Sequence, residues 1–171
     1  YTVVRLDGDD RRKFEQAVKW EQQLAPHLAA MATGTEVFSN AIRQGLEELN
    51  DRSELVMLRI SDTGCRGLTG PELATDTVDE SDYGNFVKLC RLDLFSGKAQ
   101  TSGGSYGLGK AVYWRFSAVN TVLFNSTVLP NEGCDGKTHN RLFGISQGSV
   151  HRVGGHRLQG RGSFGVESEI T

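Results

Sequence analysis

The glycines of this chain are unevenly spread, and their distribution constrains the fold more than any other feature. Of the 21 glycines in 171 residues, 14 lie between residues 97 and 165. Glycine permits tight turns and weakens helices because it lacks a Cβ atom. The charged, helix-friendly first half is therefore expected to hold the long helices, and the second half to consist of loops and short strands.

The spacing of apolar residues predicts the elements of the first half. Residues 1–6 are expected to form a strand. Apolar side chains at helical spacing predict helices over 11–32, with a break or restart at Pro26, and over 36–49. Leu-Val-Met-Leu-Arg-Ile at 55–60 is expected to form a buried strand.

The second half shows shorter segments of both kinds. Short helices are expected near 86–94 and 110–119, and strands at 121–126, 141–146, 150–153 and 156–158. This order predicts an α/β chain of the α+β two-layer type. We expect a mixed, mostly antiparallel sheet that helices cover on one face.

Composition excludes several classes of partner. The net charge is −2 and no block of basic residues occurs, so nucleic acid is not indicated as a partner. No apolar run is long enough to span a bilayer, so no membrane partner is expected. Cys65, Cys90 and Cys134 are far apart and include no Cys-x-x-Cys pair, which favours a reducing, cytoplasmic setting over a disulfide framework or a zinc site.

A glycine segment in the second half predicts an anion site. Gly103-Gly104-Ser105-Tyr106-Gly107-Leu108-Gly109-Lys110 runs directly into apolar residues expected to be helical. Glycines that open a helix direct several backbone N–H groups at one point, where phosphate commonly binds. A mobile linker is the alternative, and a lysine followed by bulky apolar residues argues against it.

A second polar motif follows the predicted strand at 55–60. Asp62-Thr63-Gly64 comes directly after it, 42 residues before Gly104. A carboxylate at the end of a strand can accept a hydrogen bond from the exocyclic amine of adenine, and Gly64 would allow the base to approach the backbone. The alternative is that Asp62 only caps a turn.

Together the two motifs resemble those of the GHKL (Bergerat-fold) ATPases, which include DNA gyrase, heat-shock chaperone and histidine kinase domains. Leu58–Gly64 is similar to their Asp-x-Gly box and Gly104–Lys110 to their Gly-x-x-Gly-x-Gly box, with similarity also to uncharacterised bacterial members. The resemblance implies that Asp62 and Gly64 bind adenine. It also implies a phosphate site formed by Gly104, Ser105, Tyr106, Gly107, Leu108, Gly109 and Lys110.

The resemblance also implies a domain organisation. Residues 1–171 would be one partial ATP-binding domain, 65–103 its ATP lid, and 10–50 a helical insertion. The cofactors would be ATP and Mg²⁺, and a homodimer could form through missing or lid regions. In the family's usual Asp-x-Gly-x-Gly box the second glycine comes one residue earlier than Gly67 does here.

The family also supplies Mg²⁺ and the catalytic base from a Glu-x-x-x-Asn box on its first helix. Glu36 and Asn40 fit this pattern by letter, as base and metal ligand. On a helical wheel, however, they point away from the apolar stripe of Phe38 and Gly45. We therefore expect Glu36 and Asn40 to be surface residues, and the true box to lie upstream of Tyr1.

These motifs favour the ATP-binding domain of a conformational ATPase, a hydrolase when complete. Three alternatives stay open. The chain could be a nucleotide- or partner-binding module without turnover, or a glycine-rich structural domain without a ligand. Gly104–Lys110 also fits a P-loop by letter, but Ala111 stands where that motif needs a hydroxyl for Mg²⁺.

Overall fold

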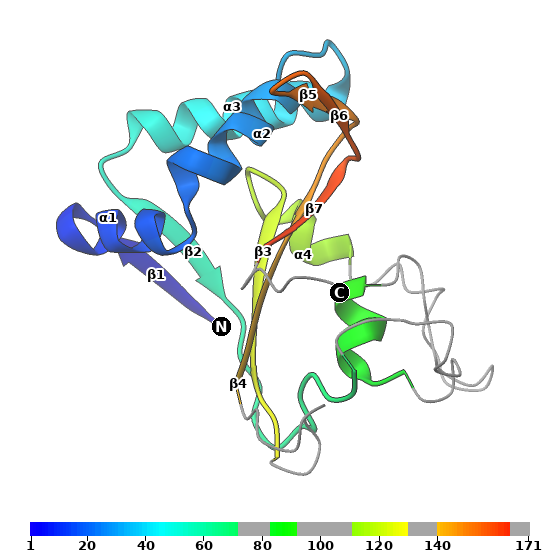
Figure 1. Cartoon of the computed structure of the whole chain (residues 1–171). Coiled ribbons are helices and arrows are strands. Elements are labelled where there is room, and N and C mark those ends of the chain that lie inside the picture. The colour runs from blue at the N-terminus through cyan, green and yellow to red at the C-terminus, as the bar shows by residue number, and fades with distance from the viewer. Residues whose placement is uncertain (72–82, 92–110, 130–139, 165–171) are drawn as a thin grey trace. The chain divides into compact units, whose positions relative to one another are not determined.

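The computed structural model describes residues 1–71, 83–91, 111–129 and 140–164 (Figure 1). The chain is of the α+β class, as the sequence predicts, and its strands pair in small antiparallel sheets. Two compact units are formed. The first consists of Tyr1–Thr63, Ser117–Thr121 and Ser146–Phe164, and the second of Gly64–Phe116, Val122–Ile145 and Gly165–Thr171.

A two-stranded sheet in the first unit leads to the Asp62 motif. Strands β1 (Thr2–Leu6) and β2 (Leu55–Arg59) pair antiparallel, with Leu6 opposite Leu55. The prediction that residues 55–60 form a buried strand is wrong in one respect, because Val56 and Leu58 are 38% and 46% exposed. Successive side chains of a strand point to opposite faces, and in this sheet only one of the two faces is partly covered.

The segment between these strands is helical. It comprises α1 (Gly8–Ala17), the π-helical turn η1 (Trp20–Leu24), α2 (Ala25–Met31) and α3 (Val37–Asp51). The restart predicted at Pro26 is confirmed: Pro26 lies in the first turn of α2, where a residue without an N–H group costs little. The break itself comes earlier, at Lys19, whose φ of 49° is left-handed.

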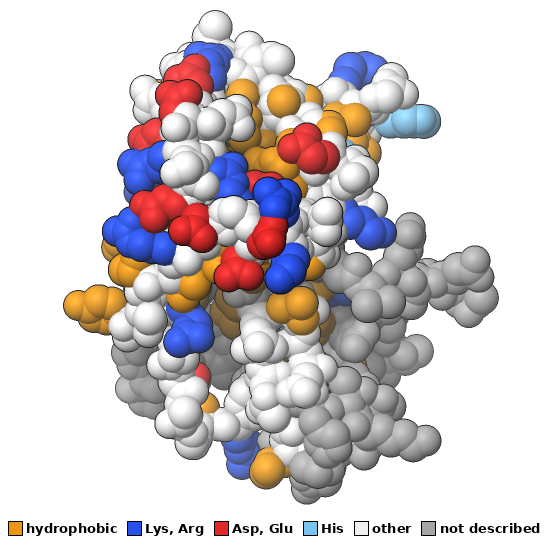
Figure 2. Space-filling model, turned by 90° about the vertical axis from the view of Figure 1, so that its left-hand side faces the viewer, with side chains coloured by type: hydrophobic (Ala, Val, Ile, Leu, Met, Phe, Trp, Pro, Cys, Tyr) orange, Lys and Arg blue, Asp and Glu red, His pale blue; other side chains and the backbone are white. Residues whose placement is uncertain are grey.

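Opposite charges cover the side of the molecule that carries α1 (Figure 2). Arg11 and Glu15 form an i,i+4 pair, and Asp9 and Arg12 an i,i+3 pair. Such pairs support an exposed helix by a few tenths of a kcal/mol each. No residue of α1 is buried and its N-cap residue Asp7 makes no side-chain hydrogen bond to the helix, so packing and side-chain capping contribute little to its stability.

The core of the first unit lies between α2 and α3. Its buried apolar side chains, with partly buried neighbours around them, are Leu28, Met31, Ala32 and Ile42. Gly45 packs against the backbone of Ala118, so the predicted stripe on this helix is confirmed at its centre. None of the helices among the described residues is both long and apolar enough to cross a bilayer.

A short hairpin packs on α2. Strands β5 (His151–Val153) and β6 (His156–Leu158) are joined by Gly154 and Gly155, whose φ values of 58° and 82° are both left-handed. Two-residue turns with positive φ at both positions match the twist of a hairpin, which explains the two glycines. Strand β7 (Arg161–Phe164) follows and was not predicted from the sequence.

The second unit has its own apolar core. Strands β3 (Thr121–Thr127) and β4 (Asn140–Gln147) belong to a three-stranded sheet of order β3-β4-β7. The helical residues of this unit lie mainly in the π-helical turn η3 (Val87–Arg91) and in α4 (Ala111–Arg115). The buried cluster consists of Leu68, Phe86, Cys90, Trp114, Phe143 and Ile145.

Candidate functional site

Asp62 follows β2 closely. Two residues separate it from Arg59, the last residue of the strand, and the antiparallel pairing with β1 fixes that end of β2. Asp62 is exposed, and so is Gly64. Gly64 has a left-handed φ of 77°, and a Cβ atom built there would meet nothing within 4 Å. The backbone conformation explains the glycine, and the open space beside it is compatible with the close approach of a ligand.

The next two glycines have structural roles in the second unit. A Cβ atom at Gly67 would lie 2.5 Å from Oγ of Ser126, which already accepts a 2.9 Å hydrogen bond from the Leu68 amide. Gly70 packs directly against the backbone of Gly84. Both glycines also have positive φ. Gly67 therefore serves the packing of this loop on β3, whatever its role toward a ligand.

The predicted phosphate segment, Gly104–Lys110, lies outside the described residues. Of the predicted lid at 65–103, the described parts are 65–71 and 83–91. Phe86, Val87 and Cys90 in the second of these are buried, and Phe86 and Cys90 belong to the core of the second unit. A lid movement that included these residues would expose core side chains to water and would be costly.

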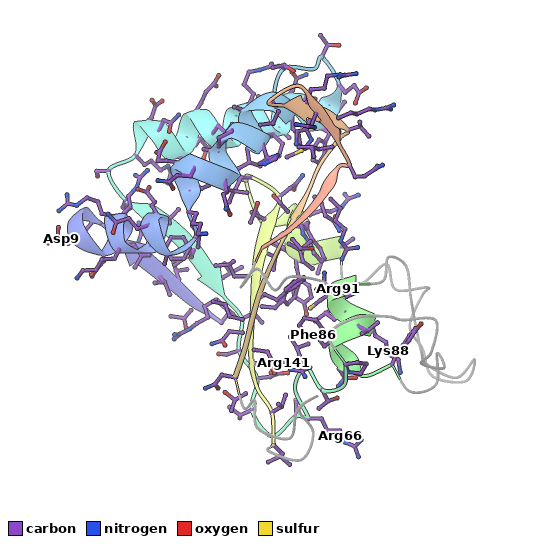
Figure 3. The ribbon with its side chains drawn as sticks, in the orientation of Figure 1. Asp9, Arg66, Phe86, Lys88, Arg91 and Arg141 are labelled. Atoms are coloured by element: carbon purple, nitrogen blue, oxygen red, sulfur yellow. The ribbon has the colours of Figure 1, made fainter. Side chains whose placement is uncertain are left out.

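Two arginine side chains pack against aromatic rings of the second unit's core. The guanidinium of Arg141 approaches the ring of Phe86, with 5.3 Å from Cζ to the centroid (Figure 3). Cζ of Arg91 lies 4.6 Å from the centroid of the Phe143 ring. Arg141 is 5% exposed and donates a 2.7 Å hydrogen bond to the carbonyl of Leu68. Cation–π contacts of this kind stabilise the core and give both arginines a structural role.

Glu36 and Asn40 are both exposed, as the helical wheel predicts. Glu36 precedes the first turn of α3, and Asn40 lies within it. The side-chain oxygen of Asn40 accepts a 2.8 Å hydrogen bond from Arg43, and its amide nitrogen donates to the carbonyl of Thr35. A guanidinium on the oxygen that would bind Mg²⁺ repels the ion, so this arrangement does not fit a magnesium site.

Glu36 does, however, border a cleft in the first unit. The cleft has a volume of about 410 Å³ and is partly open to solvent. The residues around it come from the end of α2, the loop between α2 and α3, the first turn of α3, and β5 with the two residues before it. They are Ala30, Met31, Thr33, Gly34, Glu36, Ser39, Ser149, Val150, His151 and Arg152.

The two histidines of the β5–β6 hairpin are not cross-strand partners. His151 lies opposite Leu158 and His156 opposite Val153, so the two histidines are not paired. His151 instead contacts His27, 124 residues away in sequence. No local pattern could have indicated this contact. Among the described residues no group of three or more His, Cys, Asp or Glu side chains is placed to hold a metal ion.

Comparison of the chain with protein-family models, with curated proteins and with solved structures gave no match. The GHKL resemblance therefore depends on the residues of the two motifs.

Proposed function

We propose that this chain is the nucleotide-binding part of a conformational ATPase of GHKL type, acting in the cytoplasm. One observation carries the proposal: a strand-end Asp62-Thr63-Gly64 motif is followed, 42 residues after Asp62, by the glycine segment that starts at Gly104. The left-handed φ and open surroundings of Gly64 support it.

Each motif would have a separate chemical task. The carboxylate of Asp62 would accept a hydrogen bond from the exocyclic amine of adenine, an interaction that guanine, with a carbonyl in that position, cannot make. The backbone N–H groups of Gly104–Gly109 would hold the phosphates, and Lys110 would add a positive charge. Mg²⁺ would offset phosphate charge when bound, and we assign it no ligand from Glu36 or Asn40.

Thermal unfolding tests the proposal as a whole. Saturating ATP or ADP, at about 100 times Kd, should stabilise the protein by about 2.7 kcal/mol through linkage. For a chain of this size that corresponds to a rise in Tm of about 5–10 °C. GTP should give a much smaller rise. The proposal is wrong if none of the nucleotides shifts Tm, the outcome expected of a glycine-rich domain without a ligand.

Lys110→Ala tests the phosphate assignment separately. Losing a charge-assisted contact of about 1.5–3 kcal/mol should weaken ATP binding about 10–100-fold. Binding of adenosine, which has no phosphate, should not change. Lys13→Ala removes the same charge from an exposed lysine on α1, outside both motifs and the predicted lid, and is the matched control, expected to leave ATP affinity unaltered. An equal loss for both variants would contradict a specific role of Lys110.

The second candidate function is nucleotide binding without turnover. The hydrogen bond from Arg43 to Asn40 favours it, because it occupies the side-chain oxygen that the family pattern would give to Mg²⁺. Release of inorganic phosphate from ATP, measured alongside binding, separates the two candidates. Binding without phosphate release favours the module, and release favours the ATPase.

Glu36→Gln tests whether the letter match at Glu36–Asn40 has any function in nucleotide chemistry. We expect the shift in Tm caused by ATP, and any phosphate release, to equal those of the wild type. The reason is that Glu36 is exposed and Asn40 is bound to Arg43. Loss of phosphate release with retained ATP binding would instead identify Glu36 as the base.

A further inference from the structure

The first unit contains a pair of histidines from distant parts of the chain. His27 on α2 and His151 on β5 face each other, with 2.9 Å between Nδ1 of His27 and Nε2 of His151. Their rings meet edge to face, with centroids 5.2 Å apart. Both side chains are half-buried, and the hairpin that carries His151 packs along α2 (Figure 1). We call this the histidine contact.

A second hydrogen bond fixes which nitrogens of the histidine contact carry protons. Nδ1 of His151 lies 2.9 Å from the carbonyl oxygen of Ser149. A carbonyl oxygen can only accept, so Nδ1 of His151 must be the donor. In a neutral His151 the lone pair is then on Nε2, and Nδ1 of His27 must donate to it. When both rings are neutral, one arrangement of protons satisfies both hydrogen bonds.

Added protons disturb this arrangement. A proton on Nε2 of His151 would place two N–H groups against each other and break the bond to His27. A proton on Nε2 of His27 would leave the bond intact but create a charge in a partly desolvated position. The pKa of His27 is lowered from its ordinary value of 6.5, first by burial and second by the charge on His151. The histidine contact therefore requires that Nε2 of His151 carries no proton, and it is lost when that nitrogen takes one up, so the geometry favours the less protonated pair.

Other charged groups near the contact do not reverse this preference. Glu36 and Arg152 border the same cleft as His151, with opposite charges. The guanidinium of Arg43 is bound to the carbonyls of Ala32 and Gly34. The charged or titratable residues on the elements packed around α2 and β5 are Glu21 on η1, Arg43, Glu47, Glu48 and Asp51 on α3, Arg152 on β5, and His156 and Arg157 on β6.

We propose that the histidine contact is a pH-sensitive switch that holds the β5–β6 hairpin on α2 near neutral pH and releases it on acidification. Release would widen the cleft, because Ala30 and Met31 border it from α2 and His151 and Arg152 from β5. The unfolded chain binds the proton more readily than native His27 does. The contact therefore contributes fully above about pH 6.5, and its contribution falls as the pH drops through the lowered native pKa.

The test compares thermal unfolding of wild type and His27→Phe between pH 7.5 and pH 5. Phenylalanine keeps the edge-to-face ring contact and cannot take up a proton. We expect the Tm of the wild type to fall over this range by about 2–4 °C more than the Tm of the variant. His156→Asn, which removes an exposed histidine from the same hairpin, is the control and should keep the wild-type pH dependence. The proposal is overturned if wild type and His27→Phe depend equally on pH.

A measurement on the unaltered protein keeps the proposal testable if His27→Phe fails to fold. The ring signals of His27 and His151 and the amide signals of residues 151–158 are followed by NMR over the same pH range. We expect His27 to titrate below pH 6.5. We also expect the amides of the hairpin to lose protection on acidification, so that they exchange faster than the intrinsic rate at the same pH accounts for. Titration of His27 at or above 6.5, or unchanged protection of the hairpin, would overturn the proposal.

Discussion

Gly45→Ala should destabilise the protein by about 1–2 kcal/mol, because the added methyl group would meet backbone atoms that cannot move aside. A Cβ atom at Gly45 would lie 2.6 Å from the carbonyl carbon of Ala118 and closer still to its oxygen. These are backbone atoms, so they cannot rotate away as a side chain would. Overpacking costs about 1–3 kcal/mol or more, whereas alanine's better helix propensity returns about 1 kcal/mol.

Urea denaturation of both proteins measures the difference, with Gly162→Ala as the matched control. A Cβ atom at Gly162 would meet nothing within 4 Å, so that change should stay within about 0.5 kcal/mol of the wild type. If Gly45→Ala is neutral or stabilising, α3 does not pack on the segment around Ala118 as described.

Asp62→Asn should weaken ATP binding about 10–100-fold, the largest effect on binding expected of a single change in the adenine motif. A hydrogen bond to a charged acceptor contributes about 1.5–3 kcal/mol to the binding free energy, and a hydrogen bond to a neutral amide oxygen contributes only part of that. The side-chain volume is nearly unchanged and Asp62 is exposed, so the stability of the unliganded protein should change by no more than about 1 kcal/mol. Isothermal titration with ATP measures the loss, and unaltered affinity would exclude Asp62 from the adenine site.

The matched control for Asp62→Asn is Asp51→Asn. Asp51 ends α3 and is exposed, so the same loss of charge occurs away from the motif. ATP affinity should stay at the wild-type value in this variant. An equal loss in both would show that overall charge governs affinity, and not a hydrogen bond to adenine.

The long elements could be predicted from the sequence because their apolar residues repeat at a helical or strand period. The stripe on α3 and the strand at 121–127 are examples. The turn between β5 and β6 was signalled by Gly154-Gly155, since glycine alone adopts left-handed φ without strain. In these places the local preference of the chain and its tertiary packing agree.

Other features depend on contacts that no local pattern contains. The left-handed conformation at Lys19 ends α1 although lysine has no preference for it. The exposure of Val56 and Leu58 follows from the two-stranded sheet having one covered face, which a run of apolar letters does not reveal. The histidine contact joins residues 27 and 151 across most of the chain.

The candidate site was predicted from two motifs, and the described residues bear on one of them. The left-handed φ of Gly64 explains why glycine occupies this position. Gly67 is explained by packing, because a Cβ atom there would collide with the side chain of Ser126. The bond between Arg43 and Asn40 could not be foreseen from a four-residue spacing, because it depends on the rotamers of both side chains. The roles of Gly104–Lys110 stay a prediction.

Isothermal titration of the wild-type chain with ATP and with GTP tests the central claim most directly. The account predicts ATP binding that is at least about 10-fold tighter than GTP binding, since one charge-assisted hydrogen bond separates the two bases. It also predicts that Asp62→Asn reduces this preference. Equal affinity for the two nucleotides, or no binding of either, would contradict the claim that Asp62 and the glycine segment form an adenine nucleotide site.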